Sequence, residues 1–561
     1  MTPTIFESEQ GAESLAYGGE NLEDPIDPVE GAAVFVQKEQ LASGDHVVVF
    51  GAGLGYRLHR LRELGCKDPI VFEPSDAVLA LAKKHGPGIP EGVTLFTDLQ
   101  ELNRHLFGLS KPNDNTLLLC PPPYRRAFPE AYDGLTRVLD EVQGMVILRR
   151  NSIADRTVPM TEEALSNLPR LASVASIDAL GRPLEGQPAF LVAAGPSLDR
   201  NRHLIERAGK CGAVFAVNTS APALAAIDCP IDLLVSIEVL DVSAPIKAAA
   251  KVSRALALDL TSGGANYEAG IDNIVTFCAD SSGYRQLADQ LGLSVLPYGG
   301  SVATAAFALA ARLGADPIVL LGQDLAYTDG RGYASDTLFE GTRVHRDGKI
   351  LMIDRVAAWE EMTRAGGLRV PSKLRPCVEA DAWGGEGIVW STHELTLFRR
   401  WFEMAAQKLM GLTRLINATE GGASIKGFEE IGLEALLDTL PEVEHGLHEA
   451  IAAAQPLDAT RVRDVAKGVA SKSGELAAAA KRCRKALRRG DSRGLERATA
   501  RLRQAASEAR LAEAHAAPKL HEIMDDASIP SLEREHRTFA AIRASAERVQ
   551  ALARNAARAA R

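Results

Sequence analysis

Long hydrophobic runs are absent from this sequence. No stretch approaches the roughly 18 consecutive apolar residues that a membrane-spanning helix needs. The first ten residues carry acidic side chains, whereas a secretory signal peptide has a basic and then an apolar segment. We therefore expect a cytoplasmic protein with no membrane insertion. Hydrophobic residues make up 46% of the chain and charged residues 24%, which is typical of a globular protein and excludes a disordered or collagen-like one.

Cysteine pairs at metal-binding spacing are also missing. The seven cysteines lie far apart, and none belongs to a CxxC motif. This spacing argues against a cysteine-based zinc site and against the disulfide framework of a small secreted domain. Most of the cysteines are therefore expected to be small buried hydrophobic residues.

Aromatic residues are few, at 5% of the chain, and the region from Ile451 to Arg561 contains only Phe539. That region has 23 Lys and Arg against 13 Asp and Glu, a net charge of +10, whereas residues 1–450 have 40 against 60, a net charge of −20. Its Ala and Arg content favours long helices. The basic side chains indicate either a solvated helical surface or a docking surface for an acidic partner. Nucleic acid is not expected, because there is no aromatic platform for stacking bases.

An α/β domain is predicted at the start of the chain. The apolar run 46–50 leads into Gly51-Ala52-Gly53-Leu54-Gly55 and a helical stretch, which is the entry to a doubly wound fold. A second run, 70–72, ends at Glu73, the place where such folds use an acidic residue to bind a ribose hydroxyl. The glycine turn fits a nucleotide or S-adenosylmethionine pocket, but such strand-to-helix turns are also common as packing turns without a ligand. Further strands are predicted at 117–120 and 144–148, and the domain is assigned to residues 1–155.

A second α/β domain is predicted over residues 156–428. It contains short continuous apolar runs of the kind found in strands covered by helices on both faces, so we expect parallel pairing. The runs are 189–194, 213–217, 233–237, 274–278 and 318–321. Residues 429–561 are expected to form an all-α region. The predicted fold class is therefore α/β, with two Rossmann-like doubly wound domains followed by helices.

Ligands of doubly wound sheets bind beyond the carboxyl ends of the strands, so the residues after each run are candidates for a site. Gly195, Pro196 and Ser197 follow the first run. Gly195 lets a ligand approach the backbone, Pro196 suits a first helical turn, and free amides there favour an anion such as phosphate. Asn218 follows the second run and offers a carboxamide with donors and acceptors. A turn capped by Ser197 and a buried structural Asn are the alternatives.

Two later turns add polar groups. Gly300 and Ser301 open a helix of small residues and present unpaired amides and a hydroxyl, which suits a second anion. The last run leads into Gly322-Gln323-Asp324 and a polar loop with Tyr327 and Tyr333. Phenol hydroxyls donate hydrogen bonds to a departing phosphate without adding charge. Two helix N-termini and two phenols together suit a phosphorylated ligand that also carries a carboxylate.

These turns resemble, in order and rough spacing, those of the motility-associated factor (Maf) glycosyltransferases of flagellin, whose central domain is similar to bacterial CMP-sialic-acid sialyltransferases. The resemblance covers about residues 185–428. It rests on Ala194-Gly195-Pro196-Ser197, Gly299-Gly300-Ser301, Gly322-Gln323-Asp324-Leu325-Ala326-Tyr327 and Asn417-Ala418-Thr419-Glu420-Gly421-Gly422-Ala423. It implies transfer of a nonulosonic acid, of the pseudaminic or legionaminic acid type, from its CMP-activated form to Ser or Thr of flagellin, a modification needed for flagellum assembly and motility.

The resemblance also implies roles for matching residues. Gly195, Pro196 and Ser197 would face the donor's phosphate, Asn218 the nucleotide, and Ser301 the donor's anionic end. Gly300 and Gln323 belong to the same donor site. Tyr327 and Tyr333 would stabilise the leaving CMP, with Asp324 beside them. C2 of such a sugar develops oxocarbenium character, so help for phosphate departure lowers the barrier, and a base takes the acceptor proton late. No cofactor is required.

Two departures from the sialyltransferase pattern leave the general base unassigned. Ala194 stands where those enzymes have an asparagine. His393 lies near the stretch that corresponds to their histidine but is out of register with it, and His345 lies in a different loop. Glu420, in the Thr-Glu-Gly-Gly turn, and Glu238, just beyond the run 233–237, are the carboxylate candidates. Each is equally compatible with a capping or surface role.

Two other functions fit parts of the pattern. Archaeal 6-hydroxymethylpterin diphosphokinases share the Gly-Pro-Ser turn, and such an ATP-dependent enzyme needs carboxylates to hold a divalent metal, for which Asp324 and Asp329 are available. The N-terminal domain and basic C-terminal region have little use in a small-molecule kinase. The third interpretation is a non-catalytic flagellin-binding factor.

Overall fold

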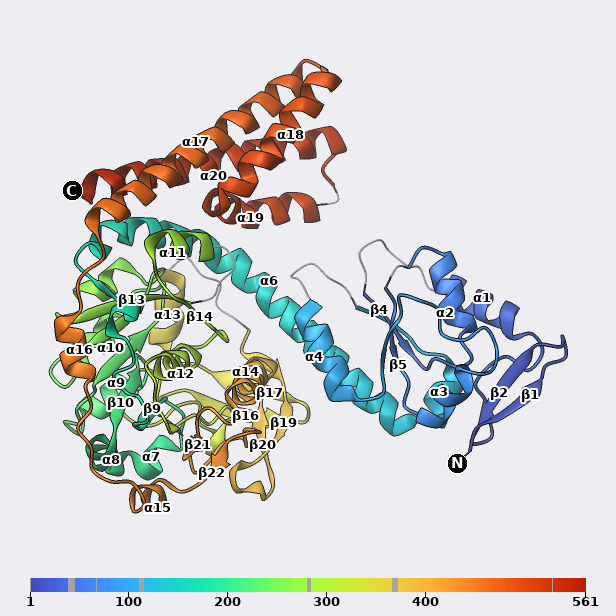
Figure 1. The fold of residues 1–561 in the computed structure, drawn as a ribbon, viewed down its shortest axis with the longest axis horizontal. Helices are drawn as coiled ribbons and strands as arrows, with labels where there is room; N and C mark the ends of the chain where they lie inside the picture. Colours follow the sequence, from blue (N-terminus) through green and yellow to red (C-terminus); the bar gives the residue numbers. More distant parts are fainter. Residues whose placement is uncertain are drawn as a thin grey trace. The chain divides into compact units, whose positions relative to one another are not determined.

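The computed structural model of the protein describes residues 2–38, 46–66, 68–109, 116–279, 284–365, 372–526 and 528–560, without the side chains of some helical residues among them. The chain divides into two compact units, an N-terminal unit, Met1–Asn151, and a C-terminal unit, Ser152–Arg561. Figure 1 shows the path of the chain through both.

The N-terminal unit is built on a four-stranded parallel sheet in the order β6-β5-β4-β7. Its strands are β4 (His46–Phe50), β5 (Ile70–Phe72), β6 (Thr94–Phe96) and β7 (Thr116–Leu119). Its helices are α1 (Pro28–Lys38), α2 (Tyr56–Glu63), α3 (Asp76–Ala82), α4 (Leu99–Leu109) and α5 (Pro122–Ala127), and an antiparallel sheet of β1 (Thr4–Glu7), β2 (Glu13–Tyr17) and β3 (Glu20–Asn21) precedes them. The predicted Rossmann-like architecture is confirmed here, because consecutive parallel strands are joined by helices.

The strand predicted at 144–148 is wrong. A single helix, α6 (Pro129–Leu171), runs through these residues and continues into the C-terminal unit. The apolar run is only a few residues long, and a run of that length fits a helix as well as a strand. Its flanks decide the outcome, since Leu, Glu and Gln before the run and Arg after it are good helix formers.

The C-terminal unit is built on a large parallel sheet in the order β14-β13-β12-β11-β10-β9-β15-β21-β22, with β8 beside β13. The strands are β8 (Ala175–Ser176), β9 (Ala189–Val192), β10 (Ala213–Val217), β11 (Leu233–Ser236), β12 (Leu256–Asp259), β13 (Ile274–Ala279), β14 (Val295–Leu296), β15 (Ile318–Leu321), β21 (Leu415–Asn417) and β22 (Glu429–Glu430). All five predicted strands are confirmed, and every neighbouring pair is parallel.

Both faces of this sheet are buried, as the continuous apolar runs indicated. Leu191 of β9 packs into the cluster that contains α12 (Val302–Arg312), whereas its neighbours Phe190 and Val192 pack into the cluster on the other face. The first face also receives α14 (His393–Leu409). The second receives α8 (Ile205–Cys211), α9 (Ala221–Ala225), α10 (Ser243–Ala249) and α15 (Leu433–Leu437).

The strand order reverses direction beside β9. From β9 the chain steps one way through β10 to β14, and it then returns to place β15 on the opposite side of β9. The place where the strand order reverses is called a topological switch point, and here it lies between β9 and β15. The turns that follow these two strands flank it. Those turns begin at Ala193 and Gly322, so the motifs that the sequence singled out flank the place where doubly wound folds bind ligands.

Two small antiparallel sheets lie at the carboxyl edge of the large sheet. One is an antiparallel sheet of β16 (Arg343–Asp347), β17 (Ile350–Asp354) and β18 (Leu374–Pro376), which α13 (Ala357–Ala365) interrupts. The other is the pair β19 (Val378–Asp381) and β20 (Ile388–Ser391). Both lie between β15 and β21 in the sequence.

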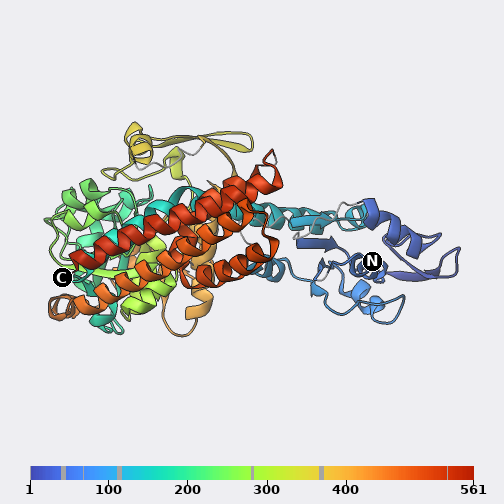
Figure 2. The ribbon, with the colours of Figure 1, turned by 90° about the horizontal axis from the view of Figure 1, so that it is seen from above.

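The end of the chain is helical, as predicted. After α16 (Leu447–Ala453) come α17 (Ala459–Arg488), α18 (Ser492–Glu508), α19 (Arg510–Asp525) and α20 (Ser531–Ala559). The two long helices α17 and α20 lie side by side (Figures 1 and 2). Their apolar faces share one cluster with α6 and with α11 (Arg285–Leu291). Among the residues described, no helix combines the length and the apolar character that crossing a membrane demands.

Candidate functional site

The glycine turn of the N-terminal unit is filled by the protein's own side chains. Three successive amides of this turn donate inward: Ala52 N to Glu73 Oε2 at 2.9 Å, Gly53 N to the Tyr124 hydroxyl at 2.7 Å, and Leu54 N to Glu23 Oε1 at 2.9 Å. A Cβ on Gly51 would lie 2.2 Å from the Tyr124 ring. Glu73 is fully buried, and burial raises its pKa to about 7 although the bonds from Ala52, Ser75 and Tyr124 lower it. This geometry favours the packing interpretation over a nucleotide pocket, because the amides already have partners.

In the C-terminal unit, the turns after β9 and β15 are joined across the switch point. Ser197 Oγ donates to Asp324 Oδ1 at 2.6 Å, Ser197 N lies 3.2 Å from Asp324 Oδ2, and Gly195 N donates to the Gly322 carbonyl at 2.7 Å. A Cβ on Gly195 would be 2.0 Å from Asp324 Oδ1, so only glycine fits there. The sequence placed these residues at one edge of the sheet, and the structure brings them into contact.

Asp324 is occupied by internal donors. Its Oδ2 also accepts from Thr328 Oγ1 at 2.7 Å, and its side chain is almost fully buried. Burial raises its pKa, whereas the hydrogen bonds from Ser197 and Thr328 lower it. Asp329 lies apart on the surface, where its carboxylate is 3.6 Å from Arg200. The two carboxylates considered for a divalent metal therefore point to different partners.

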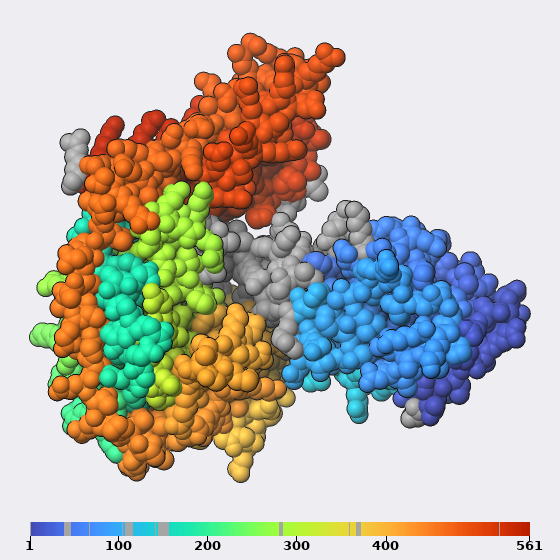
Figure 3. Space-filling model, viewed as in Figure 1, coloured from blue at the N-terminus to red at the C-terminus, as the bar shows by residue number. Residues whose placement is uncertain are grey.

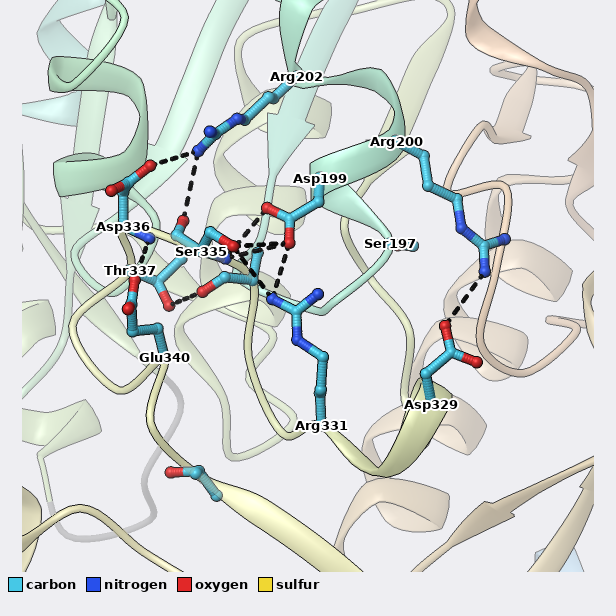
Figure 4. Close-up of polar contacts among 12 residues, drawn as sticks. Ser197, Asp199, Arg200, Arg202, Asp329, Arg331, Ser335, Asp336, Thr337 and Glu340 are labelled. Carbon is cyan, nitrogen blue, oxygen red and sulfur yellow. Dashed lines mark hydrogen bonds and ion pairs between the residues drawn. The ribbon is translucent and has the colours of Figure 1, made fainter.

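Ion pairs hold the loop after β15 against α7 (Leu198–Asn201), as Figure 4 shows. Arg331 NH2 is 2.7 Å from Asp199 Oδ2, and the Ser335 amide and hydroxyl each donate to Asp199 at 3.0 Å. Arg202 pairs with Asp336 at 2.7 Å. Tyr333 lies between Arg331 and Ser335 in the sequence, so both flanks of this tyrosine are anchored to the same carboxylate.

Tyr327 and Tyr333 are two of three tyrosines whose pKa values are raised by burial and by the charge of Glu394; the third is Tyr298, which precedes α12. Burial raises the pKa of Tyr327 to about 12, and it raises the pKa values of Tyr298 and Tyr333 as well. The carboxylate of Glu394 acts in the same direction on all three. The phenols therefore keep their protons at neutral pH and serve as uncharged hydrogen-bond donors.

Three charged residues of this group were not found from the sequence. They are Glu394 in the first turn of α14, Arg355 just after β17, and Arg375 in β18. Burial and the nearby Arg375 lower the pKa of Arg355, whereas Tyr327, Glu394 and Tyr333 raise it. The charges of Arg355, Arg375 and Glu394 all influence the pKa of Tyr327, so this edge combines two cations that could attract an anion with a carboxylate that could act as a base. No motif marks them, because they lie in the antiparallel insertion and the helix that follows it.

The remaining predicted residues have varied surroundings. Asn218 is 2% exposed, and its Oδ1 has no hydrogen-bond partner among the residues described. Ser301 caps α12, where its Oγ accepts from Thr304 N at 3.4 Å, and Gly300 has a φ of +97°, which suits glycine. Gln323 is buried, and its backbone amide donates to Thr419 Oγ1 at 3.3 Å. Pro196 is buried in the turn before α7.

The two carboxylates considered as the base differ in their availability. Glu420 Oε1 accepts from Leu433 N at 2.8 Å, so this side chain holds the start of α15. Glu238 lies 3.9 Å from Arg156 with about a quarter of its side chain exposed, and its charge raises the pKa values of Tyr298 and Tyr333. Glu238 therefore acts electrostatically on two of the three tyrosines, whereas Glu420 stabilises the start of α15.

Comparison with known proteins identifies the fold. Residues 162–330 match the family described as 6-hydroxymethylpterin diphosphokinase MptE-like. The structure of the MAf glycosyltransferase from Magnetospirillum magneticum AMB-1 is similar over 99% of this chain and 92% of that one, with a TM-score of 0.51 and 14% sequence identity. The chain has the fold of that glycosyltransferase. The resemblance that the motifs predicted is thus confirmed for the fold, and it extends from residues 185–428 to almost the whole chain. No curated protein matches the sequence.

Proposed function

We propose that the protein is a glycosyltransferase that moves a nonulosonic acid, of the pseudaminic or legionaminic acid type, from its CMP-activated donor to Ser or Thr of flagellin. The observation that carries the proposal is the position of Tyr327 at the carboxyl edge of the sheet, where its backbone amide donates to the Trp390 carbonyl at 2.7 Å, shortly before Glu394 of α14. Besides burial, the charge of Glu394 raises the pKa values of Tyr298, Tyr327 and Tyr333 alike. The shared fold along nearly the whole chain supports the same reading.

The three tyrosines and the two arginines can stabilise CMP as a leaving group. A CMP-activated nonulosonic acid carries a phosphate and a carboxylate, and both charges are met by protonated phenols and by Arg355 with Arg375. As the bond from C2 to the phosphate oxygen breaks, negative charge grows on the phosphate while C2 becomes oxocarbenium-like. Donors already fixed around that phosphate stabilise the transition state more than the ground state.

Asn218 is proposed to read the nucleotide. A buried carbonyl oxygen without a hydrogen-bond partner costs about 1–3 kcal/mol, so a ligand that supplies a donor recovers this free energy. Asn218 Oδ1 is such an atom, and the exocyclic amine of cytosine is such a donor. Gly195, Pro196 and Ser197 then act through the shape of the turn, since the Ser197 hydroxyl already bonds to Asp324. Gly300 and Ser301 offer the N-terminus of α12 to the donor's second anionic group.

Glu394 is proposed as the general base that takes the acceptor proton. Glu394 is exposed, and its negative charge raises the pKa values of all three phenols. Glu394→Gln should lower kcat by about 10²-fold or more. Glu420→Gln is the matched control, because its side chain serves α15, and kcat should change only a few-fold. Equal losses in both variants would reject Glu394 as the base, and a loss confined to Glu238→Gln would move the role to Glu238.

The helical C-terminal region is proposed to dock an acidic surface of the acceptor. Arg463, Lys467, Arg554 and Arg558 of α17 and α20 line one hollow. Charge reversal at Arg554 and Arg558 should weaken flagellin capture and leave CMP binding unchanged. Reversal of Arg488 and Arg489, exposed at the end of α17, is the control. Weakening of both kinds of binding, or equal weakening in the control, would indicate a structural role.

Phosphoryl transfer is the second candidate, and the family match over residues 162–330 favours it. Its weakness is the metal site, since Asp324 is bonded to Ser197 and Thr328 and Asp329 faces Arg200. The direct test is incubation of flagellin with CMP-pseudaminic or CMP-legionaminic acid, with the acceptor followed by mass spectrometry. A mass increase that needs both enzyme and donor supports the transferase. Its absence with active donor, together with ATP turnover on a pterin, supports the kinase, and inactivity in both assays supports a flagellin-binding factor.

A further inference from the structure

Three potential metal ligands meet at the amino edge of the large sheet, away from the carboxyl edge where the proposed transferase site lies. Asp232 immediately precedes β11, His445 lies in the segment before α16, and His448 is in the first turn of α16. One ligand atom from each residue lies within 4.8 Å of the other two. The cluster combines residues that lie more than 200 positions apart in the sequence, so no sequence motif indicates it.

The distances suit a tetrahedral metal ion. His448 Nε2 is 2.9 Å from Asp232 Oδ1, and His445 Nε2 is 3.4 Å from Asp232 Oδ2. Around a four-coordinate Zn²⁺ with bonds of about 2.0–2.1 Å, neighbouring ligand atoms lie about 3.3 Å apart. Small adjustments of the side chains therefore place an ion among them. Both imidazoles present Nε2 to the carboxylate, one to each oxygen, so a cation bound here would replace these two contacts with metal–ligand bonds.

The scaffold under the cluster is already fixed. Asp232 Oδ2 accepts from Val214 N at 2.7 Å, and the Asp232 side chain is only 8% exposed. The segment that carries the histidines is tied to the sheet nearby, where Val443 N donates to the Lys210 carbonyl at 2.8 Å. Figure 3 shows this orange segment lying along the teal and green part of the C-terminal unit. Preorganised ligands lower the cost of ordering a metal site.

The charges around the cluster also permit a cation. Arg254 is the competing group, since its NH1 lies 3.7 Å from Asp232 Oδ1. Its side chain is 55% exposed, so it can move into solvent when a metal binds. The His448 side chain is 26% exposed, so this ligand is accessible to a metal ion from solvent.

We propose that Asp232, His445 and His448 form a binding site for one divalent transition metal ion, with Zn²⁺ as the ion that best matches one carboxylate and two imidazoles. The ion fixes the chain segment that leads from the sheet through α16 to the helical bundle. Its role is structural, because the site lies at the edge opposite the proposed catalytic group. The proposal is independent of the transferase assignment.

The test is metal titration of the full-length, tag-free protein after treatment with a chelator. Zn²⁺ is followed by calorimetry and Co²⁺ by its visible absorption, which reports coordination by four ligands. We expect one equivalent to bind the wild-type protein and a rise in its melting temperature with Zn²⁺. His448→Ala should weaken binding by about 100-fold or more, since even loss of an outer-shell partner costs 10–100-fold. This variant changes the most exposed ligand and so is the least harmful to folding.

Two further variants make the outcome decisive. Asp232→Asn keeps an acceptor for Val214 N but removes the charge, and it should weaken binding as His448→Ala does. His203→Ala, at an exposed histidine outside the cluster, should bind metal like the wild type. Absence of stoichiometric binding to the wild-type protein would overturn the proposal and leave two histidine–aspartate ion pairs. Undiminished binding by both His448→Ala and Asp232→Asn would overturn it as well.

Discussion

The Ser197 hydroxyl donates a hydrogen bond of 2.6 Å to the buried Asp324 carboxylate. This contact joins the turns after β9 and β15, the two strands that flank the switch point of the sheet. Thr328 donates to the same carboxylate, so the start of the tyrosine loop is held as well. Asp324 therefore acts as a positioning residue, because it holds the turn after β9 and the start of the loop that carries Tyr327 and Tyr333.

Removing this contact should destabilise the C-terminal unit. Ser197→Ala leaves a buried carboxylate short of one donor, and Asp324→Ala leaves the donors of Ser197 and Thr328 without their acceptor. We expect losses of about 1–3 kcal/mol, seen as earlier thermal unfolding. Ser471→Ala, at an exposed serine of α17, should stay within about 0.5 kcal/mol of the wild type. A Ser197→Ala protein as stable as this control would contradict the role of the contact.

The pair of Asp199 and Arg331 should matter more for activity than for stability. Both side chains are partly exposed, so the ion pair adds at most about 1 kcal/mol to stability. It anchors the loop that carries Tyr333, and a displacement of about 1 Å at a reacting centre costs about 10²-fold in rate. Asp199→Ala and Arg331→Ala should each slow transfer at least about 10-fold, and the double variant should be little slower than either. Additive losses would show that the two residues act independently.

The phenols should be required for transfer and dispensable for folding. Tyr327→Phe together with Tyr333→Phe removes two hydrogen-bond donors and keeps both aromatic rings. Loss of one fixed donor to a developing anion costs about 10²–10³-fold in kcat, so the double variant should be inactive in practice. Circular dichroism and the melting temperature should match the wild type. Transfer at the normal rate would remove the tyrosines from the mechanism.

The N-terminal unit should lose stability as the pH rises from about 4.5 to about 7. Glu73 has its pKa raised by burial to about 7, so the folded state holds a proton there that the unfolded state releases near its ordinary value of 4.5. The stabilisation is fully present below pH 4.5 and is lost as the pH passes 7, a change on the order of 3 kcal/mol. Urea unfolding followed by pulse proteolysis measures it. Glu73→Gln should flatten the profile, and an unchanged slope in this variant would assign the dependence elsewhere.

The strands β4, β5 and β7 of the first parallel sheet and β9, β10, β11, β13 and β15 of the second were predictable, because their apolar runs are continuous and bounded by glycine or polar turns. The other strands of these sheets, β6, β8, β12, β14, β21 and β22, were not predicted, because most of them are only two or three residues long. The contact between Gly195–Ser197 and Asp324 was predictable in part, since both turns follow strands that end at the same edge. The sequence did not reveal that Asp324 is bonded to Ser197, 127 positions away, because this contact depends on β9 and β15 being neighbours in the sheet.

Other features depend on contacts that no local pattern carries. The run 144–148 became part of α6 because its helical flanks outweighed four apolar residues. The charges of Glu394, Arg355 and Arg375 influence the pKa of Tyr327 only through the folding of an antiparallel insertion, and Tyr124 bonds to Glu73 across 51 positions. In each case the partner residue is ordinary in sequence and is defined by its place in three dimensions.

Calorimetric titration with CMP, and then with ATP and Mg²⁺, on the wild-type protein and on Asn218→Ala distinguishes the transferase from the kinase. We predict that CMP binds the wild-type protein, that ATP with Mg²⁺ does not, and that Asn218→Ala loses most of its affinity for CMP while melting like the wild type. Binding of ATP with Mg²⁺ in place of CMP, or CMP affinity unchanged in Asn218→Ala, would contradict this prediction.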